Sequence, residues 1–557
     1  MVYITLPVAY TLLYVTVVSF AAVVVVLQSC SNGRLVETVR ESLFHPSEEL
    51  LSSRGQHGWV SLMLSLVASF MGNWVLFLPL DAGAYYGWPG ITGYAIASCL
   101  PYVVLLWFAP LVKRMTLTEG FAGTDYLVSR YGRTVQVGAT LVSLCFMFVC
   151  LSMELTTVGI TMRAVTGGAF PVFAAVIPIA LVTLAYTTYG GLRASIMTDV
   201  YQGGLIVGLL VPLLVTVCLT GKKGVEELGG AATEAFSTPL SRQYIAGAVL
   251  IVSIWPTFLF DQGIWQRVWA GKSVRDVRIA LGGAGALAFV CVFLSGAMGI
   301  VCREEALAYA QQQNEENVSV FAYLAQTLPA AWVGVLTVLA VTCVSSSVDT
   351  FQTALASVFA QDLIRKQLSF NWARVLIVCL NVPAILVAAL QLDVLMLTMI
   401  ANVMCVIGAG PLVASAWTKT NRVGMIGGFC LAFLAFLTCG WITTGDFVQG
   451  VAFIAPVDFS DVPYLVAFIL VPLIGAVSTV GVSCLYTWFC ARCLRPSKET
   501  SKVLSRHVEI SDMLAASEQK MQSNVSSAVS LEKCVGDEQK VEDGGPTVFE
   551  IFPAADK

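Results

Sequence analysis

The stretch Cys343-Val344-Ser345-Ser346-Ser347-Val348-Asp349-Thr350-Phe351-Gln352 lies inside an apolar run from about Ala331 to Ala360. That run is long enough for a membrane-spanning helix, which needs roughly 20 residues. Asp349 is unusual there, because an ionisable residue at this depth is costly and usually marks an ion pathway. On a helix, four neighbouring side chains of the stretch share one face: Cys343, Ser346, Ser347 and Thr350.

This polar face has two interpretations. Serine and threonine in membrane helices often serve close packing and bond to their own backbone. Hydroxyl and carboxylate oxygens are also hard ligands, which suit a small hydrated cation better than a soft metal. Because Asp349 adds a charge to the hydroxyls, we favour a cation-related role for this face.

The rest of the chain has the composition of a polytopic membrane protein. Of its 557 residues, 57% are hydrophobic and only 12% are charged. This hydrophobic fraction is larger than an ordinary globular core needs. We therefore expect an all-α membrane protein that crosses the bilayer about 13 times. The expected spans are 3–27, 59–84, 92–112, 135–162, 171–188, 197–220, 243–262, 279–301, 331–360, 374–392, 394–417, 423–442 and 464–490.

Several function classes find no support in the sequence. There is no Walker loop, GxSxG elbow or Rossmann fingerprint, so an ATP-driven pump or a hydrolase is not indicated. The three histidines lie far apart, and the 16 cysteines are scattered, mostly inside apolar runs. We expect no enzyme activity, no cofactor and no nucleic-acid partner, and a monomer or weak oligomer surrounded by membrane lipid.

The positive charges predict the orientation. With thirteen spans in order, most of the 31 Lys and Arg residues fall on one set of alternate loops and in the tail. The positive-inside rule makes that side cytoplasmic, so the N-terminus is expected outside and the C-terminus inside, with the plasma membrane as the expected location. We expect a transmembrane domain over 1–495. Residues 496–557 are rich in Ser, Glu and Lys, and are expected to form a disordered cytoplasmic tail.

Two expected spans contain helix-breaking residues. Gly72-Asn73 falls in the middle of 59–84, and Pro256 falls in the middle of 243–262, five spans later. Such breaks are common kinks that shape packing. When they occupy corresponding positions of two halves, they also point to a transporter's binding site. Spans two to six and seven to eleven form two sets of five, and each set opens with an interrupted span. Because five is an odd number, the second set starts on the opposite side of the membrane and would be inverted relative to the first. The core repeats are expected at about 59–220 and 243–442.

One stretch resembles the sodium/solute symporter family. Tyr189-Gly190-Gly191-Leu192-Arg193-Ala194-Ser195-Ile196-Met197-Thr198-Asp199-Val200-Tyr201-Gln202 is similar to the GG-L-x-A-x-x-x-T-D-x-x-Q signature of that family. Ala68–Trp74, Asp261–Arg267 and the serine run ending in Gln361-Asp362-Leu363 resemble further family motifs. The resemblance covers about 1–495 and implies a LeuT-like, five-plus-five inverted-repeat transporter driven by sodium.

The resemblance also implies ion-binding residues. One sodium site would use the backbone carbonyls of Ala68, Met71 and Cys343 and the hydroxyls of Ser346 and Ser347. A second site, found in some relatives, would use Asp199, Ser346, Asp349 and Thr350. Here Asp349 departs from the family pattern, which has a serine. Two nearby carboxylates need either a second cation between them or a proton on one of them, so we expect a second cation or proton site there.

The solute pocket is expected beside the two helix breaks, near the middle of the membrane. By position, the candidate residues are Gly72, Asn73, Trp74, Trp255 and Leu259. Because no arginine is evident in this set to clamp a carboxylate, a neutral or cationic solute such as urea, a polyamine or choline is favoured. A helix N-terminus can bind a carboxylate unaided, so an amino acid such as proline stays open. The Asp261–Arg267 stretch resembles the urea/polyamine branch.

We therefore expect a sodium-coupled secondary active symporter that imports a small polar organic solute by alternating access. The alternatives are a proton-coupled transporter of the same fold, or an uncoupled channel or sensor. A channel predicts a continuous polar file, and a sensor predicts a folded output domain. Neither pattern is present in the sequence.

Overall fold

The structure is a computed structural model that describes residues 3–32, 53, 55–115, 124–220, 238–313, 319–359, 362, 370–455 and 460–493. Within these ranges the chain is helical and contains no β-strand. An isolated bridge pairs His57 with Gly271. The expected tail at 496–557 lies outside the described residues.

Ten helices in the described part of the chain are long and apolar enough to cross a membrane. They are α1 (Leu6–Asn32), α5 (Leu78–Met115), α7 (Arg133–Val165), α8 (Val172–Thr220), α10 (Leu240–Ile254) continued by α11 (Thr257–Phe260), α13 (Val274–Val301), α16 (Ala330–Val358), α18 (Val394–Ala414), α19 (Arg422–Thr444) and α21 (Val462–Cys493). Three shorter apolar helical segments are α4 (Trp59–Phe70), Val172–Thr187 at the start of α8, and Val378–Ala389 within α17 (Phe370–Ala389). Together they match the thirteen expected spans and confirm the all-α, multi-pass fold class.

The remaining elements are short. They are η1 (Asn73–Leu76), α6 (Asp125–Tyr131), α12 (Gln262–Ala270), α14 (Arg303–Gln313), α15 (Val320–Thr327) and α20 (Phe447–Ala452).

Two expected boundaries are wrong. The third span was expected to begin near residue 92, but α5 already begins at Leu78 and bends at Gly87, where φ is 55° and ψ is −149°. The fifth and sixth spans were expected to be separated by a loop, but both belong to α8, which bends at Gly191 with φ 56° and ψ −152°. A residue with a Cβ rarely adopts this backbone conformation, so glycine permits a sharp bend where a loop was expected.

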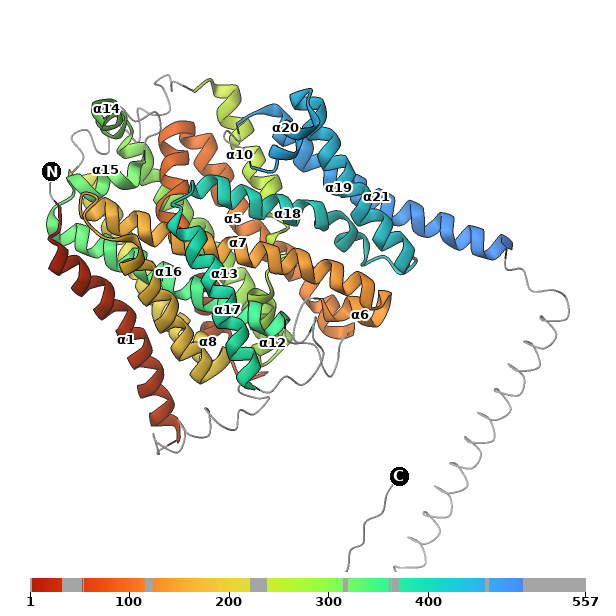
Figure 1. Ribbon diagram of the computed structural model, residues 1–557, viewed down its shortest axis with the longest axis horizontal. Coiled ribbons are helices and arrows are strands. Elements are labelled where there is room, and N and C mark those ends of the chain that lie inside the picture. The colour runs from red at the N-terminus through yellow and green to blue at the C-terminus, as the bar shows by residue number, and fades with distance from the viewer. Residues whose placement is uncertain are drawn as a thin grey trace, which may run out of the picture. The chain divides into compact units, whose positions relative to one another are not determined.

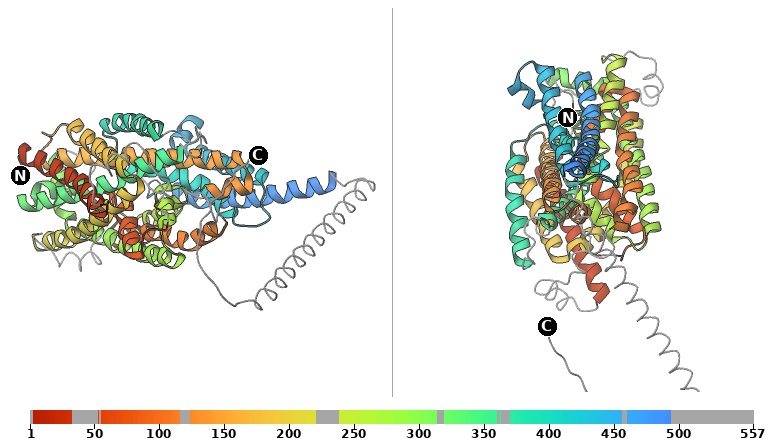
Figure 2. Two further views of the ribbon diagram at one scale, coloured as in Figure 1. Left: turned by 90° about the horizontal axis from the view of Figure 1, so that it is seen from below. Right: turned by 90° about the vertical axis from the view of Figure 1, so that its right-hand side faces the viewer.

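Two groups of helices pack around α4. One group consists of α5, α10 and α13, in which both α10 and α13 contact α5. In the other group α16 packs against both α7 and α8, as Figure 1 shows. Figure 2 gives two further views of the bundle. The segment η1, which follows the end of α4, contacts α5 and α13 of the first group and α7 and α16 of the second, so the end of α4 lies where the two groups meet.

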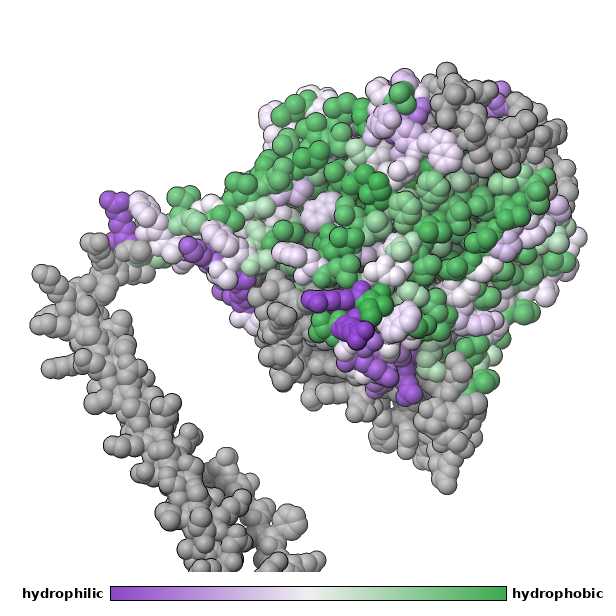
Figure 3. Space-filling model, turned by 180° about the vertical axis from the view of Figure 1, so that it is seen from behind, coloured by the Kyte–Doolittle hydropathy of each residue, from purple (hydrophilic) through white to green (hydrophobic). Residues whose placement is uncertain are grey.

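The outer surface is apolar and the interior holds the polar groups. Figure 3 shows hydrophobic side chains over much of the visible face, and large residues such as Trp107 and Leu219 are exposed. In contrast, the three consecutive serines of α16 (345–347) are buried, as are Asp349 and Thr350. This is the arrangement expected when lipid, and not water, surrounds the helices.

Candidate functional site

The first expected helix break is present at the end of α4. The helix ends at Phe70, Met71 and Gly72 leave the helical conformation, and η1 begins at Asn73. The amide of Gly72 donates to the Phe70 carbonyl at 2.9 Å, and the amide of Val75 donates to the Gly72 carbonyl at 3.2 Å. In a continuous helix these two amides would bond the carbonyls of Ala68 and Met71. The break therefore frees those two carbonyls from their helical partners.

Glu154 of α7 reaches into this break. Its Oε2 accepts a hydrogen bond from the backbone amide of Asn73 at 2.9 Å. A Cβ added to Gly72 would lie 1.8 Å from Glu154 Oε1, so only glycine leaves room for the carboxylate there. The side-chain amide of Asn73 donates to Thr161 Oγ1 at 2.9 Å, which ties η1 to α7 a second time.

At the second expected break the helix is interrupted but not unwound, because Trp255 and Pro256 keep right-handed helical backbone angles, and the backbone becomes extended only at Asp261. Helix α10 ends at Ile254, and α11 is a single turn that ends at Phe260. Asp261 then caps α12, because its Oδ1 accepts hydrogen bonds from the amides of Gly263 at 2.9 Å and Ile264 at 3.2 Å. A buried carboxylate thus stands at each of the two breaks.

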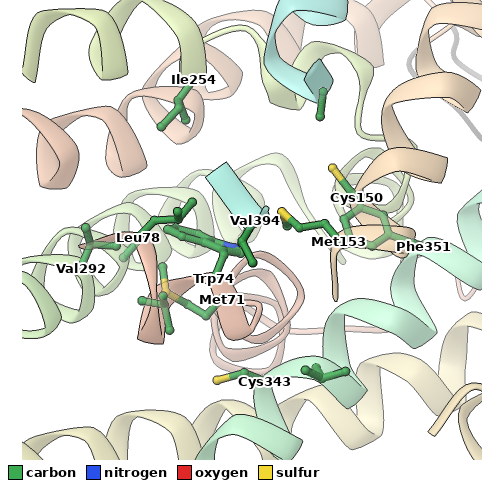
Figure 4. Packing of buried hydrophobic residues seen from close by; sticks show 14 of the residues in the cluster. Met71, Trp74, Leu78, Cys150, Met153, Ile254, Val292, Cys343, Phe351 and Val394 are labelled. Carbon is green, nitrogen blue, oxygen red and sulfur yellow. The ribbon is translucent and has the colours of Figure 1, made fainter. Parts of the chain in front are cut away.

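The five residues expected for the sodium site are all buried: Ala68, Met71, Cys343, Ser346 and Ser347. Ser347 Oγ donates to the Ser69 carbonyl at 3.3 Å, which joins α16 to the end of α4. Ser346 Oγ donates to Asp199 Oδ1 at 2.6 Å. Figure 4 shows Met71 and Trp74 at the break, and Cys343 on α16. The freed carbonyls and the α16 hydroxyls thus lie on elements that contact each other.

Arg267 occupies the region expected for a second cation. The side chain is fully buried and its Nη2 lies 2.5 Å from Asp199 Oδ2. The same nitrogen donates to Thr350 Oγ1 at 2.7 Å and to Ser195 Oγ at 3.1 Å. Its Nε donates to Ser65 Oγ at 2.8 Å, and Nη1 donates to the Gly263 carbonyl at 3.0 Å. The guanidinium therefore supplies a positive charge that the sequence argument did not place beside Asp199.

Arg267, Ser195, Asp199 and Thr350 form a polar cluster with Asp349. The hydrogen-bond donors to Asp349 are hydroxyl groups. Asp349 accepts hydrogen bonds from Tyr186 Oη at 2.7 Å and from Ser195 Oγ at 3.0 Å. The hydroxyls of Thr198 and Thr350 lie 3.3 Å from its oxygens. Ser195 links the two carboxylates, since it accepts from Arg267 and donates to Asp349.

A cavity lies beside the two breaks. Six aromatic side chains line it: Phe70, Trp74, Tyr94, Phe146, Phe258 and Phe351. Its polar lining includes Glu154, Asp261 and Asn402. Ser69 and Ser347 also border it, so the cavity adjoins the expected sodium site.

The expected solute residues occupy different places. Trp74 lines the cavity, and its ring stacks on Tyr94 with centroids 5.7 Å apart. Gly72 and Asn73 stand behind it at the Glu154 contact. Trp255 and Leu259 are outside the lining, which uses Ile254, Thr257 and Phe258 of the same segment.

Sequence reasoning missed Glu154 and the role of Arg267. Glu154 is an isolated acid in an expected membrane span, so the argument applied to Asp349 would have singled it out too. Arg267 ends the Asp261–Arg267 motif, but its position falls between two expected spans. Only the fold brings it to Asp199.

Similarity to known proteins agrees with this architecture. The chain is 25% identical to a spermidine transporter of Candida albicans over 364 residues, which cover 64% of this chain and 68% of the relative. It is 23% identical to a sodium/glucose cotransporter of Vibrio parahaemolyticus over 342 residues, which cover 56% of this chain and 62% of the relative.

The fold is also shared with a solved structure, that of a Na⁺-coupled sialic acid symporter in a substrate-bound outward-open state. The TM-score is 0.63 at 17% identity, and the match covers 84% of this chain and 98% of the symporter. The family model of the sodium:solute symporters matches residues 51–428. The chain therefore belongs to the sodium:solute symporter family, whose members are sodium-coupled membrane transporters and not enzymes.

Proposed function

We propose that this protein imports a small polar organic solute across the plasma membrane, driven by sodium and by alternating access. The N-terminus would lie outside and the C-terminus in the cytoplasm, as the distribution of Lys and Arg favours. The solute is neutral or cationic in this proposal. The similarity to a spermidine transporter adds support for polyamines among the candidates.

One observation carries the proposal. The end of α4 frees the carbonyls of Ala68 and Met71 directly beside the α16 face that carries Ser346 and Ser347. Neutral oxygens from a broken helix and from hydroxyls are the ligands expected for sodium. Because Ser69 and Ser347 also line the cavity, a bound sodium would stabilise the solute-binding geometry. This adjacency is a physical route for coupling the two ligands.

We retain Asp349, with Asp199 and Thr350, as the candidate second ion site. Arg267 offsets one of the two carboxylate charges through its contact with Asp199. The remaining negative charge is then available for a proton or a cation at Asp349. A sodium ion bound beside Ser346 would also offset it, because Ser346 donates to Asp199.

Uptake by the purified protein in liposomes tests the proposal. The panel is labelled urea, putrescine, choline, proline and glucose, each with and without an inward sodium gradient. We expect accumulation of one solute to require sodium. Ser346→Ala and Ser347→Ala should each raise the sodium concentration for half-maximal uptake about tenfold, since a lost ion contact of 1.5 kcal/mol corresponds to that factor.

Ser345→Ala is the matched control. Ser345 is equally buried on the same helix, but its hydroxyl donates to the Val341 carbonyl of its own helix at 2.7 Å. Its removal should leave sodium dependence unchanged. Accumulation driven only by a proton gradient would favour the proton-coupled alternative, and equilibration without accumulation would favour a channel.

A further inference from the structure

We infer that the solute is an organic cation with two amino groups, a diamine or a longer polyamine, bound between Glu154 and Asp261. This inference rests on the proposed function, because it names the chemical class of the solute in the same cavity. It assigns a role to two acids that stand at the two helix breaks.

Each of these carboxylates has one oxygen that accepts from a backbone amide and one without a hydrogen bond among the described residues. Glu154 Oε2 accepts from the amide of Asn73, and Asp261 Oδ1 accepts from two amides of α12. Among the described residues, no hydrogen bond reaches Glu154 Oε1 or Asp261 Oδ2. Both side chains line the cavity. The amide contacts fix the positions of the acids, and in this proposal the other oxygen of each acid accepts from an ammonium group.

The cavity wall contains no cation to balance these acids. None of the lining residues is Lys, Arg or His. Arg267 lies on the helix that Asp261 caps and attracts Asp261 through space, but it lies outside the cavity lining and its hydrogen bonds go to other acceptors, Asp199 among them. A buried carboxylate without a counter-ion is costly, so a cationic solute would supply the missing charge.

Asn402 provides an independent indication of a polar ligand. It is only 4% exposed, it lines the cavity, and its side-chain nitrogen has no hydrogen-bond partner within the described part of the chain. Buried amide groups are normally satisfied, so this atom is expected to meet the solute or its water. The two ends of an amide exchange by a flip, so its oxygen, which accepts hydrogen bonds, can face an ammonium group.

The rest of the wall suits the carbon chain of such a solute. Phe70, Trp74, Tyr94 and Phe258 form much of the apolar lining. Aromatic faces attract ammonium groups and pack against methylene groups. An amino acid would place its carboxylate between two acids with no arginine in the wall to hold it, and a neutral solute would leave both acids unbalanced.

Competition for labelled putrescine on the purified wild-type protein tests the inference. The competitors are unlabelled putrescine, spermidine, 1-butylamine, proline and urea, in sodium-containing buffer. Putrescine should compete at a concentration at least about tenfold below that of 1-butylamine, because a second charged hydrogen bond contributes about 1.5 kcal/mol or more. Equal potency of putrescine and 1-butylamine would overturn the inference.

Glu154→Gln and Asp261→Asn remove each charge but keep an acceptor oxygen for the backbone amides. Each should weaken putrescine binding about tenfold and reduce the preference for putrescine over 1-butylamine. Asp393→Asn is the control, since Asp393 caps α18 and lies outside the cavity lining. If a variant fails to fold, the wild-type competition series still decides the question.

Failure of this inference differs from failure of the proposed function. Sodium-driven accumulation of urea or proline, with no competition from putrescine, would overturn the diamine inference and leave sodium coupling intact. Putrescine binding and flux that ignore sodium would support the diamine site and contradict sodium coupling. Absence of diamine binding would overturn the inference.

Discussion

Two groups of buried acids lie within this bundle, and the protein treats them differently. The polar cluster around Asp199 and Asp349 contains its own cation, Arg267, and many hydroxyl donors. The cavity beside the helix breaks contains Glu154 and Asp261, with no basic residue in its wall. In the first group Arg267 offsets one of the two carboxylate charges inside the protein, and in the second group a ligand can supply the counter-charge.

This difference separates the Arg267–Asp199 pair, which is internal to the protein, from acids whose partner would be a ligand. An ionised group in a membrane interior needs a partner, and the partner's origin indicates the group's role. Arg267 donates to five different residues, so the polar cluster is expected to hold its geometry throughout transport. The cavity acids each retain an oxygen without a hydrogen bond among the described residues, which suits a reversible ligand.

The largest effect should follow from removing the internal cation. Arg267→Gln would leave Asp199 buried without its charged partner, at a cost of about 3–5 kcal/mol. We expect loss of uptake and a marked fall in melting temperature. The control is Arg242→Gln, because Arg242 pairs with Asp461 at 3.6 Å on the surface, where an ion pair contributes about 0–1 kcal/mol. Equal stability of the two variants would contradict the assigned pairing.

The next effect should come from filling the space beside Glu154. In Gly72→Ala the new methyl group would overlap the carboxylate, so Glu154 must leave the break. We expect solute uptake at fixed sodium to fall at least about tenfold, as for loss of a charged hydrogen bond. Gly138→Ala on α7 is the control, since nothing lies within 4 Å of its added Cβ. If both variants transport like the wild type, Glu154 is not needed in its observed position.

A subtler change is expected from Asp349→Asn. The substitution keeps an acceptor for Tyr186 and Ser195 but removes a negative charge from the polar cluster. We expect the ion stoichiometry or the pH dependence of uptake to change, measured as the reversal potential at several pH values. An unchanged reversal potential across that range would count against a second ion site at Asp349.

The smallest effect concerns His57, just before α4. Burial, with Arg193, Lys272 and Arg267 nearby, lowers the pKa of His57 to about 4, below its ordinary value of 6.5. Between these two values the unfolded chain binds a proton that the folded protein does not, so stability falls as pH falls through this window. When the pH falls from 7 to 5, the melting temperature of His57→Gln should therefore fall less than that of the wild type, with a difference of a few degrees. Identical pH dependence would contradict this prediction.

Much of the fold could be predicted because hydropathy and helix breakers act locally. The thirteen apolar segments and the breaks at Gly72 and Pro256 follow from composition and backbone chemistry alone. The bends at Gly87 and Gly191 were missed, since glycine is also common inside straight membrane helices.

The site was predicted only in part, because its charges are paired through the fold. Asp199 and Asp349 could be placed near each other from helix faces and a family resemblance. The contact between Arg267 and Asp199 joins α12 to α8, and no local pattern reveals it. Glu154 was accessible to the depth argument, but its contact with the amide of Asn73 depends on how α7 packs against the broken α4.

The most direct test of sodium coupling is solute accumulation in liposomes with the membrane potential clamped by potassium and valinomycin. The clamp is essential, because a membrane potential alone can concentrate a cationic solute through an uncoupled pathway. At zero potential and equal pH on both sides, we predict that an inward sodium gradient drives the solute above its equilibrium level. Accumulation that depends only on the potential, or simple equilibration under the sodium gradient, would contradict sodium-coupled symport.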